Sequence, residues 1–271
     1  MQKMDFDRTL GSLRRNAASL TILHLNHKNL NDRHAAELAA ALGQNSSVVI
    51  LFMKDNYISS RGGEALCQAI AHHTTIRQAC LSYNRLGDDG AVAIAEALGP
   101  KSSNRIEVLK LSHNGITDRG ACAIAKALTE NKHLRKLELD DNEIGEQGLL
   151  ALAEAMKQNK SLTSLDVRWN QAQDVLRVQN AFNDVLHHQN VTLCTLDLLS
   201  PDQQRNQELG SAEEETQFYL EWNRLGRVAF CSPAFSQQEW FQLLEKLLAA
   251  NQAHRILHAI VRERPDLINH Y

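Results

Sequence analysis

The chain has 271 residues, of which 43% are hydrophobic and 23% are charged, an ordinary composition for a well-packed protein. Its formal net charge of −3 is too small to imply general attraction to nucleic acid or to membrane surfaces. Residues 1–15 carry charges and no apolar run, so we expect no signal peptide, and no window approaches the apolar length of a transmembrane helix.

Cysteine usage favours a reducing compartment. The five cysteines are an odd number at unrelated spacings, and none forms a C-x-x-C pair. Cys67 and Cys122 stand among alanines, where a thiol behaves as a small apolar side chain. We therefore expect a cytoplasmic protein without a disulfide framework. Three N-x-S/T sequons, at Asn45, Asn159 and Asn190, lie in polar turns and have no role in a cytosol.

Residues 1–19 are predicted to form an N-terminal helical cap. Leu10 and Leu13, followed by Arg14-Arg15-Asn16, resemble the end of the helices further along the chain, but no strand pattern precedes them. An open end of a repeat array needs such a terminal unit with a polar outer face.

From residue 20 onward a unit of one short strand and one helix recurs. Strand periodicity at Leu137 and Leu139 stands beside helix periodicity at Ala121, Ile124 and Leu128. Such a unit is too small to bury its own apolar face, so the sequence predicts a stacked solenoid. The leading apolar residues of the strands, spaced by 28, 28, 30, 28, 28 and 31 residues, are Leu20, Val48, Ile76, Ile106, Leu134, Leu162 and Leu193.

The middle units fit the strand template L-x-x-L-x-L-x-x-N-x-L. The asparagine at its ninth position can both donate to and accept from the backbone of a neighbouring coil. The first unit has Lys28 at this position and the last has Pro201, so both ends are atypical, as terminal repeats usually are. The recurring asparagines are Asn56, Asn84, Asn114, Asn142 and Asn170.

The helices follow a second template. Thr117-Asp118 suits an N-cap, and Gly120-Ala121 follows it with apolar residues at helical spacing. Small residues at the helix start let the helix lie close to the strand layer, and the longer aliphatic side chains after them fill the core. The same offsets recur after Gly62-Gly63 and after Gly90-Ala91.

Together the two templates resemble leucine-rich repeats of the ribonuclease-inhibitor type, over roughly residues 5–200. The resemblance implies an α/β fold: a right-handed horseshoe with parallel strands on the concave face, helices on the convex face and six to seven repeats over residues 20–201. Repeats of this kind, with many Gln and His residues, also resemble those in secreted effectors of intracellular bacterial pathogens. That second resemblance would place the protein in a host cytosol.

Residues 202–271 are predicted to form a helical C-terminal region, with a polar linker at 202–211. The interpretation as a cap over the last strand edge competes with that of a second binding module. If residues 202–271 form a cap, Trp240 is expected to pack against the end of the repeats. The helices are expected at about 174–188 for the sixth repeat, and then at about 212–224, 237–250 and 252–263.

Positions 5, 7 and 8 of the strand template are predicted to point into the concave face. They place a column of carboxylates on adjacent strands, about 4.8 Å apart, where like charges cost stability. The column is interpreted either as a solvated acidic face, partly neutralised by Lys110 and Arg168, or as a docking patch for a basic partner. Its members are Glu138, Asp166 and Asp197, flanked by Asp140 and Asp141.

The same positions place three aromatic residues, Phe52, Tyr83 and Trp169, on this face. Tyr and Trp are frequent binding hot spots. A register error of one residue would bury all three instead, but the asparagine that follows at a fixed position argues against such a slip.

Catalytic and metal sites are not expected. Cys80 and His113 lie on neighbouring strands three residues apart in register, about 10 Å at 3.3 Å per residue, which is too far for a nucleophile and its base. The carboxylates form a straight column, which rarely converges on one cation. The pairs His72-His73 and His187-His188 stand at helix ends and are interpreted as surface residues.

The sequence therefore predicts a non-catalytic protein-interaction scaffold that binds through its concave face. We expect a monomer that binds a protein partner with a basic surface, and no cofactor, metal, nucleic acid or membrane. The alternative is an adaptor whose repeats bind a target while the C-terminal helices recruit a second partner, such as a ubiquitin-ligase component. The predicted binding residues are Phe52, Tyr83, His113, Glu138, Asp140, Asp141, Asp166, Arg168, Trp169 and Asp197.

Overall fold

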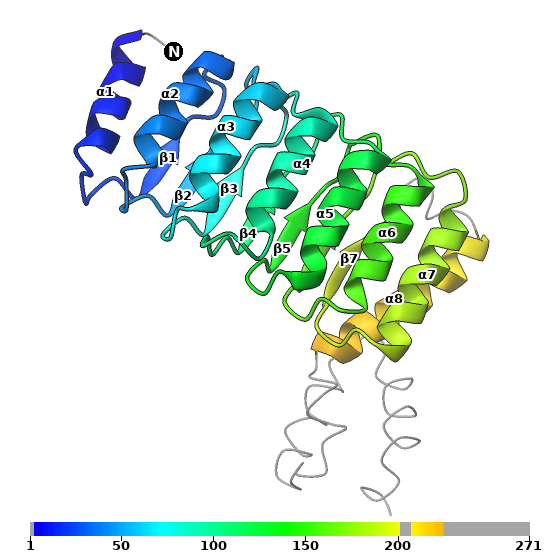
Figure 1. The fold of residues 1–271 in the computed structure, drawn as a ribbon. Coiled ribbons are helices and arrows are strands. Elements are labelled where there is room, and N and C mark those ends of the chain that lie inside the picture. The colour runs from blue at the N-terminus through cyan, green and yellow to red at the C-terminus, as the bar shows by residue number, and fades with distance from the viewer. Residues whose placement is uncertain (1–2, 201–206, 225–271) are drawn as a thin grey trace, which may run out of the picture.

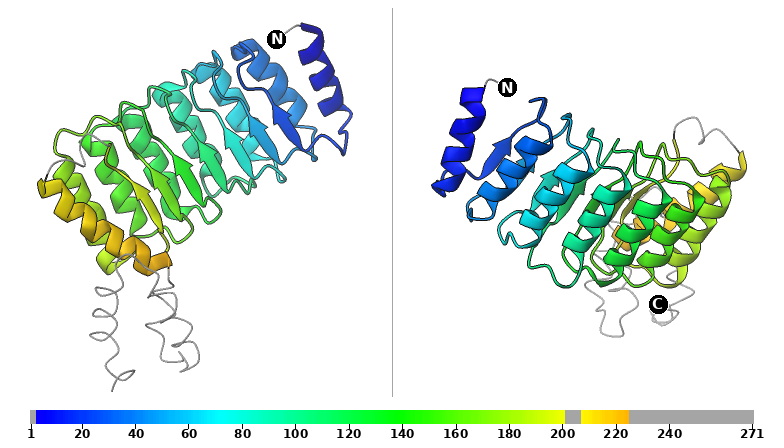
Figure 2. Two further views of the ribbon diagram at one scale, coloured as in Figure 1. Left: turned by 180° about the vertical axis from the view of Figure 1, so that it is seen from behind. Right: turned by 45° about the horizontal axis from the view of Figure 1, so that its top comes forward.

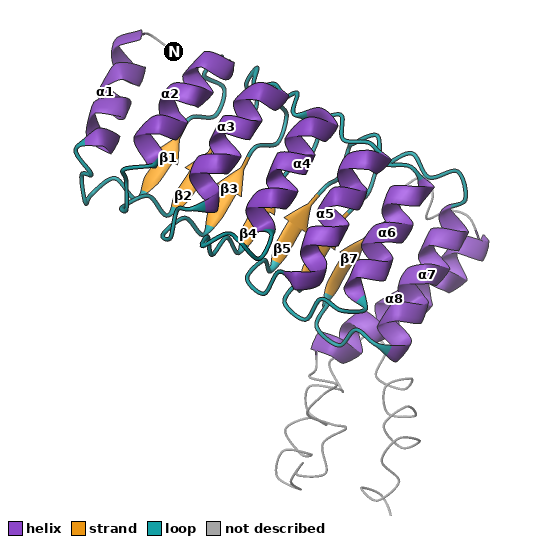
Figure 3. Cartoon of the chain, viewed as in Figure 1, coloured by secondary structure: helices purple, strands orange, loops and turns teal. Residues whose placement is uncertain are grey.

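The computed structural model describes residues 3–200 and 207–224 and shows two layers, a sheet and a row of helices (Figure 1). The sheet contains seven parallel strands in the order of the chain, β1 to β7. Strands β1 to β6 are each followed by a helix on the same side of the sheet, and among the described residues the other side of the sheet stays uncovered (Figures 2 and 3). The predicted leucine-rich-repeat solenoid is confirmed, and we refer to the uncovered side of the sheet as the concave face.

The elements have regular lengths. The strands are β1 Ile22–His24, β2 Ile50–Phe52, β3 Gln78–Cys80, β4 Val108–Lys110, β5 Lys136–Glu138, β6 Ser164–Asp166 and β7 Thr195–Asp197. The helices are α1 Lys3–Arg14, α2 Asp32–Leu42, α3 Ser60–Ala71, α4 Gly87–Leu98, α5 Asp118–Glu130, α6 Glu146–Met156, α7 Val175–His188 and α8 Gln207–Arg224.

The strand register is the one that the leucine spacing predicts. Template positions pair with their equivalents in the next unit, as His24 with Phe52 and Glu138 with Asp166. Successive side chains on a strand point to opposite faces, so Leu137 is fully buried toward the helices while its neighbours on β5 are half-buried. The two extra residues of the 30-residue unit lie in the turn after α4 and leave this register unchanged.

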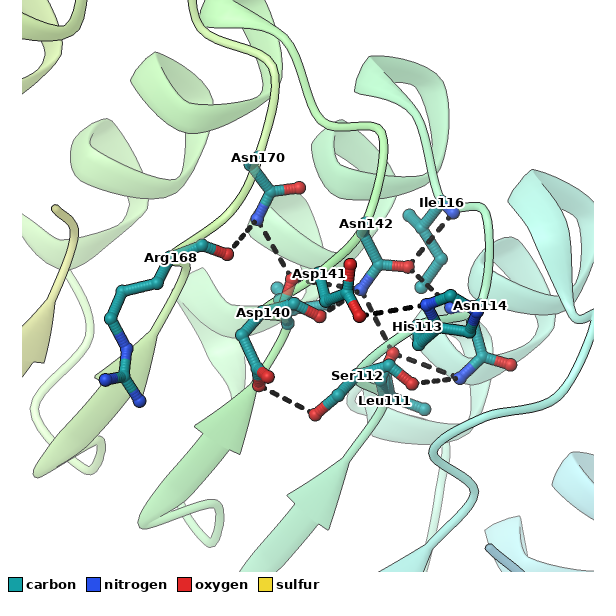
Figure 4. A network of polar contacts seen from close by, with 11 residues as sticks. Leu111, Ser112, His113, Asn114, Ile116, Asp140, Asp141, Asn142, Arg168 and Asn170 are labelled. Carbon is teal, nitrogen blue, oxygen red and sulfur yellow. Dashed lines mark hydrogen bonds and ion pairs between the residues drawn. The ribbon is translucent and has the colours of Figure 1, made fainter. Parts of the chain in front are cut away.

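The asparagines of the strand template form a hydrogen-bonded ladder across the units (Figure 4). The side-chain amide of Asn114 donates to Leu81 O of the preceding unit, at 3.1 Å, and to Leu111 O of its own unit, at 3.0 Å. Its backbone N–H donates 2.9 Å to the side-chain oxygen of Asn142, the next rung. Asn114 thus bonds to the neighbouring coil, as predicted from the sequence.

A second ladder of asparagine side chains, not predicted from the sequence, lies where the helices end. Asn131, for example, donates to Leu98 O at 2.9 Å, and its side-chain oxygen accepts from the backbone N–H of His133 and Leu134. The three sequon asparagines are rungs of this ladder and are buried, with exposed fractions of 7%, 1% and 0%. They are Asn45, Asn159 and Asn190.

His73 stands at the same place in the third unit, and its prediction as a surface residue is wrong. Its side chain is 4% exposed, and Nδ1 accepts from the backbone N–H of Ile76 at 3.3 Å. Nε2 is buried without a hydrogen-bond partner among the described residues. Burial lowers the pKa of His73 below its usual value because the charged imidazolium would lose its hydration.

The helix N-termini are capped mainly from the preceding unit. Thr117 occupies the predicted N-cap position but does not cap α5 with its own side chain. Instead Asp88 of the preceding helix accepts from Thr117 N at 2.8 Å and from Gly120 N at 3.0 Å. A Cβ at Gly120 would come within 2.7 Å of the Asp88 carboxylate, so the glycine permits this close approach.

Both described ends of the array are closed by helices. Leu10 and Leu13 of α1 are buried, as expected for a cap. At the other end α8 packs on α7, and Asn223 donates to Asn190 O and Leu193 O as a further rung of the second ladder. Phe218, Tyr219 and Trp222 of α8 are buried.

The prediction of a linker through residue 211 is wrong, because α8 begins at Gln207. Its buried face includes polar side chains: Thr216 bonds to Gln179 and Asn183 of α7, so the apolar period is interrupted. The helices predicted at 237–250 and 252–263, and Trp240, lie outside the described residues. Within the described ranges no helix is both long and apolar enough to span a membrane.

Candidate functional site: the concave face

The concave face is a grid of side chains from template positions 3, 5, 7 and 8. Each unit adds one row, and neighbouring rows are about 4.8 Å apart, as adjacent strands must be. Position 3 also points to this face, which the sequence analysis overlooked, although the two-residue period of a strand would have shown it. It contributes Ile22, which is 40% exposed, and Lys136.

Four of the ten predicted residues line one pocket, which we call the strand pocket. They are Phe52, Tyr83, Glu138 and Asp140, and the cavity volume is about 410 Å³. Its other walls include two cationic side chains, of which Lys54 lies 4.6 Å from the centre of the Tyr83 ring. The strand pocket therefore combines aromatic surface with both signs of charge.

Three other predicted residues, His113, Asp141 and Trp169, line a second pocket of about 560 Å³, which we call the rim pocket. It lies where the strands end and the chain turns toward the helices. His113 connects the two pockets: its ring stacks on Tyr83, with centroids 4.9 Å apart, and Nδ1 lies 2.9 Å from an Asp141 carboxylate oxygen.

The remaining predicted residues, Asp166, Arg168 and Asp197, continue the acidic column on β6 and β7. Arg168 donates two hydrogen bonds to Asp166, at 3.0 and 2.6 Å, in a bidentate pair. The Asp197 carboxylate makes no hydrogen bond or ion pair with any other residue of 3–200 or 207–224, although the Asp197 backbone carbonyl accepts from Val167 N at 2.8 Å.

The acidic column is partly neutralised by the two cationic residues named in the sequence analysis, since Lys110 pairs with Glu138 and Arg168 pairs with Asp166. Asp166 is buried, and the Glu138 side chain is 17% exposed beneath Lys110 and Lys136, at 2.8 and 3.0 Å. Burial alone would raise the pKa of Glu138, but hydrogen bonds and charge attraction from the two lysines outweigh it, and the pKa is lowered.

Asp140 and Asp197 are less well compensated, although Arg168 and Lys136 attract the Asp197 carboxylate. Burial and the negative charge of Asp166 raise the pKa of both carboxyls above the usual value, although Asp140 accepts a 2.7 Å hydrogen bond from the Ser112 hydroxyl. The column therefore holds unfavourable negative charge that an added cation would relieve.

Position 8 has an unusual backbone conformation. In six consecutive units its φ lies between 52° and 57°, in the left-handed region. Asp and His tolerate this region fairly well, whereas a bulky side chain there is an outlier. Tyr83 and Trp169 nevertheless occupy it, with 40% and 49% of their surfaces exposed. The six residues are His27, Asp55, Tyr83, His113, Asp141 and Trp169.

Cys80 and His113 contact different partners on this face. Cys80 contacts Ser82, at 3.8 Å, while His113 is engaged by Tyr83 and Asp141. No group of three His, Cys, Asp or Glu side chains in 3–200 and 207–224 has the arrangement of a metal site.

A larger pocket, of about 800 Å³, lies at the opposite rim, where α4 and α5 end. It contains none of the ten predicted residues. Its polar groups serve the fold: Asn131 belongs to the second ladder, and the Lys160 ammonium donates to the carbonyls of Lys157 and Gln189.

Comparisons with known proteins support the repeat assignment. The family model described as Leucine Rich repeat matches residues 81–95, 102–125, 130–153 and 158–174. No curated protein matches the chain.

Two solved structures match the chain at low sequence identity and low TM-score. The actin-binding site 2 of leiomodin-1 is 19% identical, with a TM-score of 0.38, over 90% of this chain and 98% of that one. The C-terminal domain of tropomodulin from Caenorhabditis elegans is 15% identical, with a TM-score of 0.39, over 83% and 98%. Both TM-scores are low, so neither protein's binding partner is carried over to this chain.

Proposed function

We propose that this leucine-rich-repeat protein is a non-catalytic scaffold that binds a protein partner through its concave face. The observation that carries the proposal is the pair Tyr83 and Trp169. Both are large, exposed aromatic residues on a backbone conformation that a smaller residue would adopt at less cost. Neither fills the core, so their size is explained by contact with another molecule.

The charge pattern favours a partner with a basic surface. Asp140 and Asp197 are half-buried, repel Asp166 and have raised pKa values, so a cation of the partner placed among them would gain from all three carboxylates. The chain also carries a net negative charge of −3, which adds a weak long-range attraction.

Site-specific photocrosslinking tests the face. A crosslinking amino acid replaces Gln78, which lies half-buried on the concave side of β3, and in a matched control it replaces Gln68, which is exposed on α3. We expect a partner captured from cell lysate to crosslink at Gln78 and not at Gln68. Capture through Gln68 alone would move the binding surface to the convex helices and refute the proposal.

The finer assignments rest on sequence pattern. The ribonuclease-inhibitor type fits the 28-residue period and the alternation of strand and helix. The interpretation as a translocated bacterial effector acting in a host cytosol is drawn from the repeats and their many Gln and His residues. An adaptor that recruits a ubiquitin-ligase component would use the C-terminal region 202–271, of which the structure describes 207–224. Comparing the partners captured by the whole chain and by residues 1–224 would test the adaptor alternative.

A further inference from the structure

The rim pocket has a composition that neither the repeat fold nor the acidic column explains. It is formed by three consecutive units just beyond β3, β4 and β5, with Trp169 of the following unit as one wall. Two carboxylates, Asp141 and Glu143, line it together with His113. Aromatic surface and negative charge therefore meet in one cavity of about 560 Å³.

The carboxylates of this pocket have unused hydrogen-bonding capacity. Asp141 is bonded through its side chain to His113 alone among the described residues. Glu143 is exposed, and its carboxylate makes no hydrogen bond or ion pair within 3–200 and 207–224. Arg85, which also lines the pocket, has its guanidinium 5.4 Å from the ring centre of Tyr57 and forms no ion pair with Asp141 or Glu143.

Trp169 is already shown by the structure to accept a cation. The guanidinium carbon of Arg168 lies 4.9 Å from its ring centre, and the side chain still exposes 49% of its surface. An indole ring is the best aromatic acceptor for a cation, and the contact strengthens when the pair is desolvated.

Two glycines leave the pocket open. Gly87 and Gly115 both have left-handed backbones, with φ of 57° and 66°, and both line the cavity. A Cβ on Gly87 would meet nothing within 4 Å, and one on Gly115 would meet only the Glu143 carboxylate, at 3.8 Å. Space therefore remains beside the two carboxylates for a flat group from outside.

We propose that the rim pocket binds an arginine side chain of the partner, with the guanidinium against Trp169 and its N–H groups donating to Glu143 and Asp141. Arginine fits better than lysine because its planar fork both stacks on aromatic rings and donates two parallel hydrogen bonds. This inference rests on the proposed function, since it identifies one anchor of the basic partner, but the pocket can be tested without the partner.

The test uses N-acetyl-arginine amide as the probe and N-acetyl-citrulline amide as its neutral isostere. Each is titrated into the ¹⁵N-labelled full chain while the indole N–H signal of Trp169, assigned with Trp169→Phe, is followed by NMR. We expect the arginine probe to shift this signal in a saturable manner and the citrulline probe to leave it nearly unchanged. Equal shifts from both probes, or none from either, would overturn the proposal.

Variants place the contact within the pocket. Neutralising Glu143→Gln or Asp141→Asn should weaken the arginine probe about two- to five-fold each, the effect of one exposed charge pair. The matched control is Asp55→Asn, three units away from Asp141. It removes the equivalent carboxylate, whose oxygen lies 2.7 Å from Nδ1 of His27. Weakening by Asp55→Asn as large as that by Asp141→Asn would show a general charge effect and refute the site. If the arginine probe does not bind but the partner still crosslinks at Gln78, the rim-pocket proposal is refuted while the proposed binding through the concave face is retained.

Discussion

Asn142 provides the sharpest test of how the repeats are held together. Its side-chain oxygen accepts from the backbone N–H of Asn114, at 2.9 Å, and of Ile116, at 3.2 Å, and neither N–H has another partner in the described structure. The Asn142→Ala substitution leaves both buried donors unsatisfied. At about 1–3 kcal/mol for each orphaned group, the free energy of unfolding should fall by about 2–6 kcal/mol.

The carbonyl groups that Asn142 also binds add little to this cost. Leu111 O keeps the amide of Asn114, and Leu139 O keeps the amide of Asn170. The matched control is Asn170→Ala, one rung further on, where only the N–H of Ile144 loses its partner. That variant should lose about 1–3 kcal/mol.

Urea unfolding followed by circular dichroism would measure both variants, with Asn180→Ala on the exposed side of α7 as a surface control. The expected order of destabilisation is Asn142, then Asn170, then Asn180. If Asn142→Ala costs no more than Asn170→Ala, the ladder does not stabilise the chain through its buried N–H groups, and the reasoning is wrong.

Three further outcomes are expected. His73→Asn should stabilise the fold by about 1–2 kcal/mol, because asparagine fits the second ladder and removes the unsatisfied Nε2. Because the pKa of His73 is lowered in the folded state, the unfolded state binds a proton more readily, and the parent should lose stability as the pH falls below about 6.5. Urea titrations at pH 7.5 and 5.5 should show a smaller loss of stability for His73→Asn than for the parent. Asp197→Asn should stabilise the chain at pH 7 and less so at pH 3, because the raised pKa of the Asp197 carboxyl means that the folded state favours its uncharged form. Thermal melts of the variant and the parent at both pH values would measure the difference. Trp169→Gly should leave the free energy of unfolding unchanged or slightly raised, because glycine adopts the left-handed backbone freely. The same variant should weaken partner binding by at least about 2 kcal/mol through a faster off-rate, which surface plasmon resonance would measure.

The fold was largely predictable because its register is repeated in the sequence. Each leading apolar residue, such as Ile106, lies two residues before the first residue of a strand. The Asn114 amide donates to the backbone of the preceding unit, as expected for a side chain that can both donate and accept. The second ladder also had a signal, since Asn131 and Asn159 stand three residues before Leu134 and Leu162. Histidine in the third unit interrupted that pattern, and so its burial was missed.

The concave face was only partly predictable. Template positions placed Glu138 and Asp166 on one face, but their burial depends on where the long side chains of Lys136 and Arg168 lie, which no spacing reveals. The grouping of predicted residues into two pockets likewise depends on side-chain packing. The start of α8 was missed because residues 207–211 contain a single large apolar residue, Leu209, so no helical period begins there.

The bonds between consecutive units have a consequence for how the array can change in length. Asparagine rungs and aspartate caps join each unit to its neighbour through groups 26 to 33 residues apart. Removing one whole 28-residue unit would bring together equivalent partners, whereas removing a few residues from a strand or helix would break the rungs between the shortened unit and its neighbours. Extra residues are tolerated in the turn after α4, where the 30-residue unit keeps its register. The concave face can therefore lengthen or shorten in whole-unit steps, by duplication or excision of a coding segment, with the hydrogen bonds between units restored at each step.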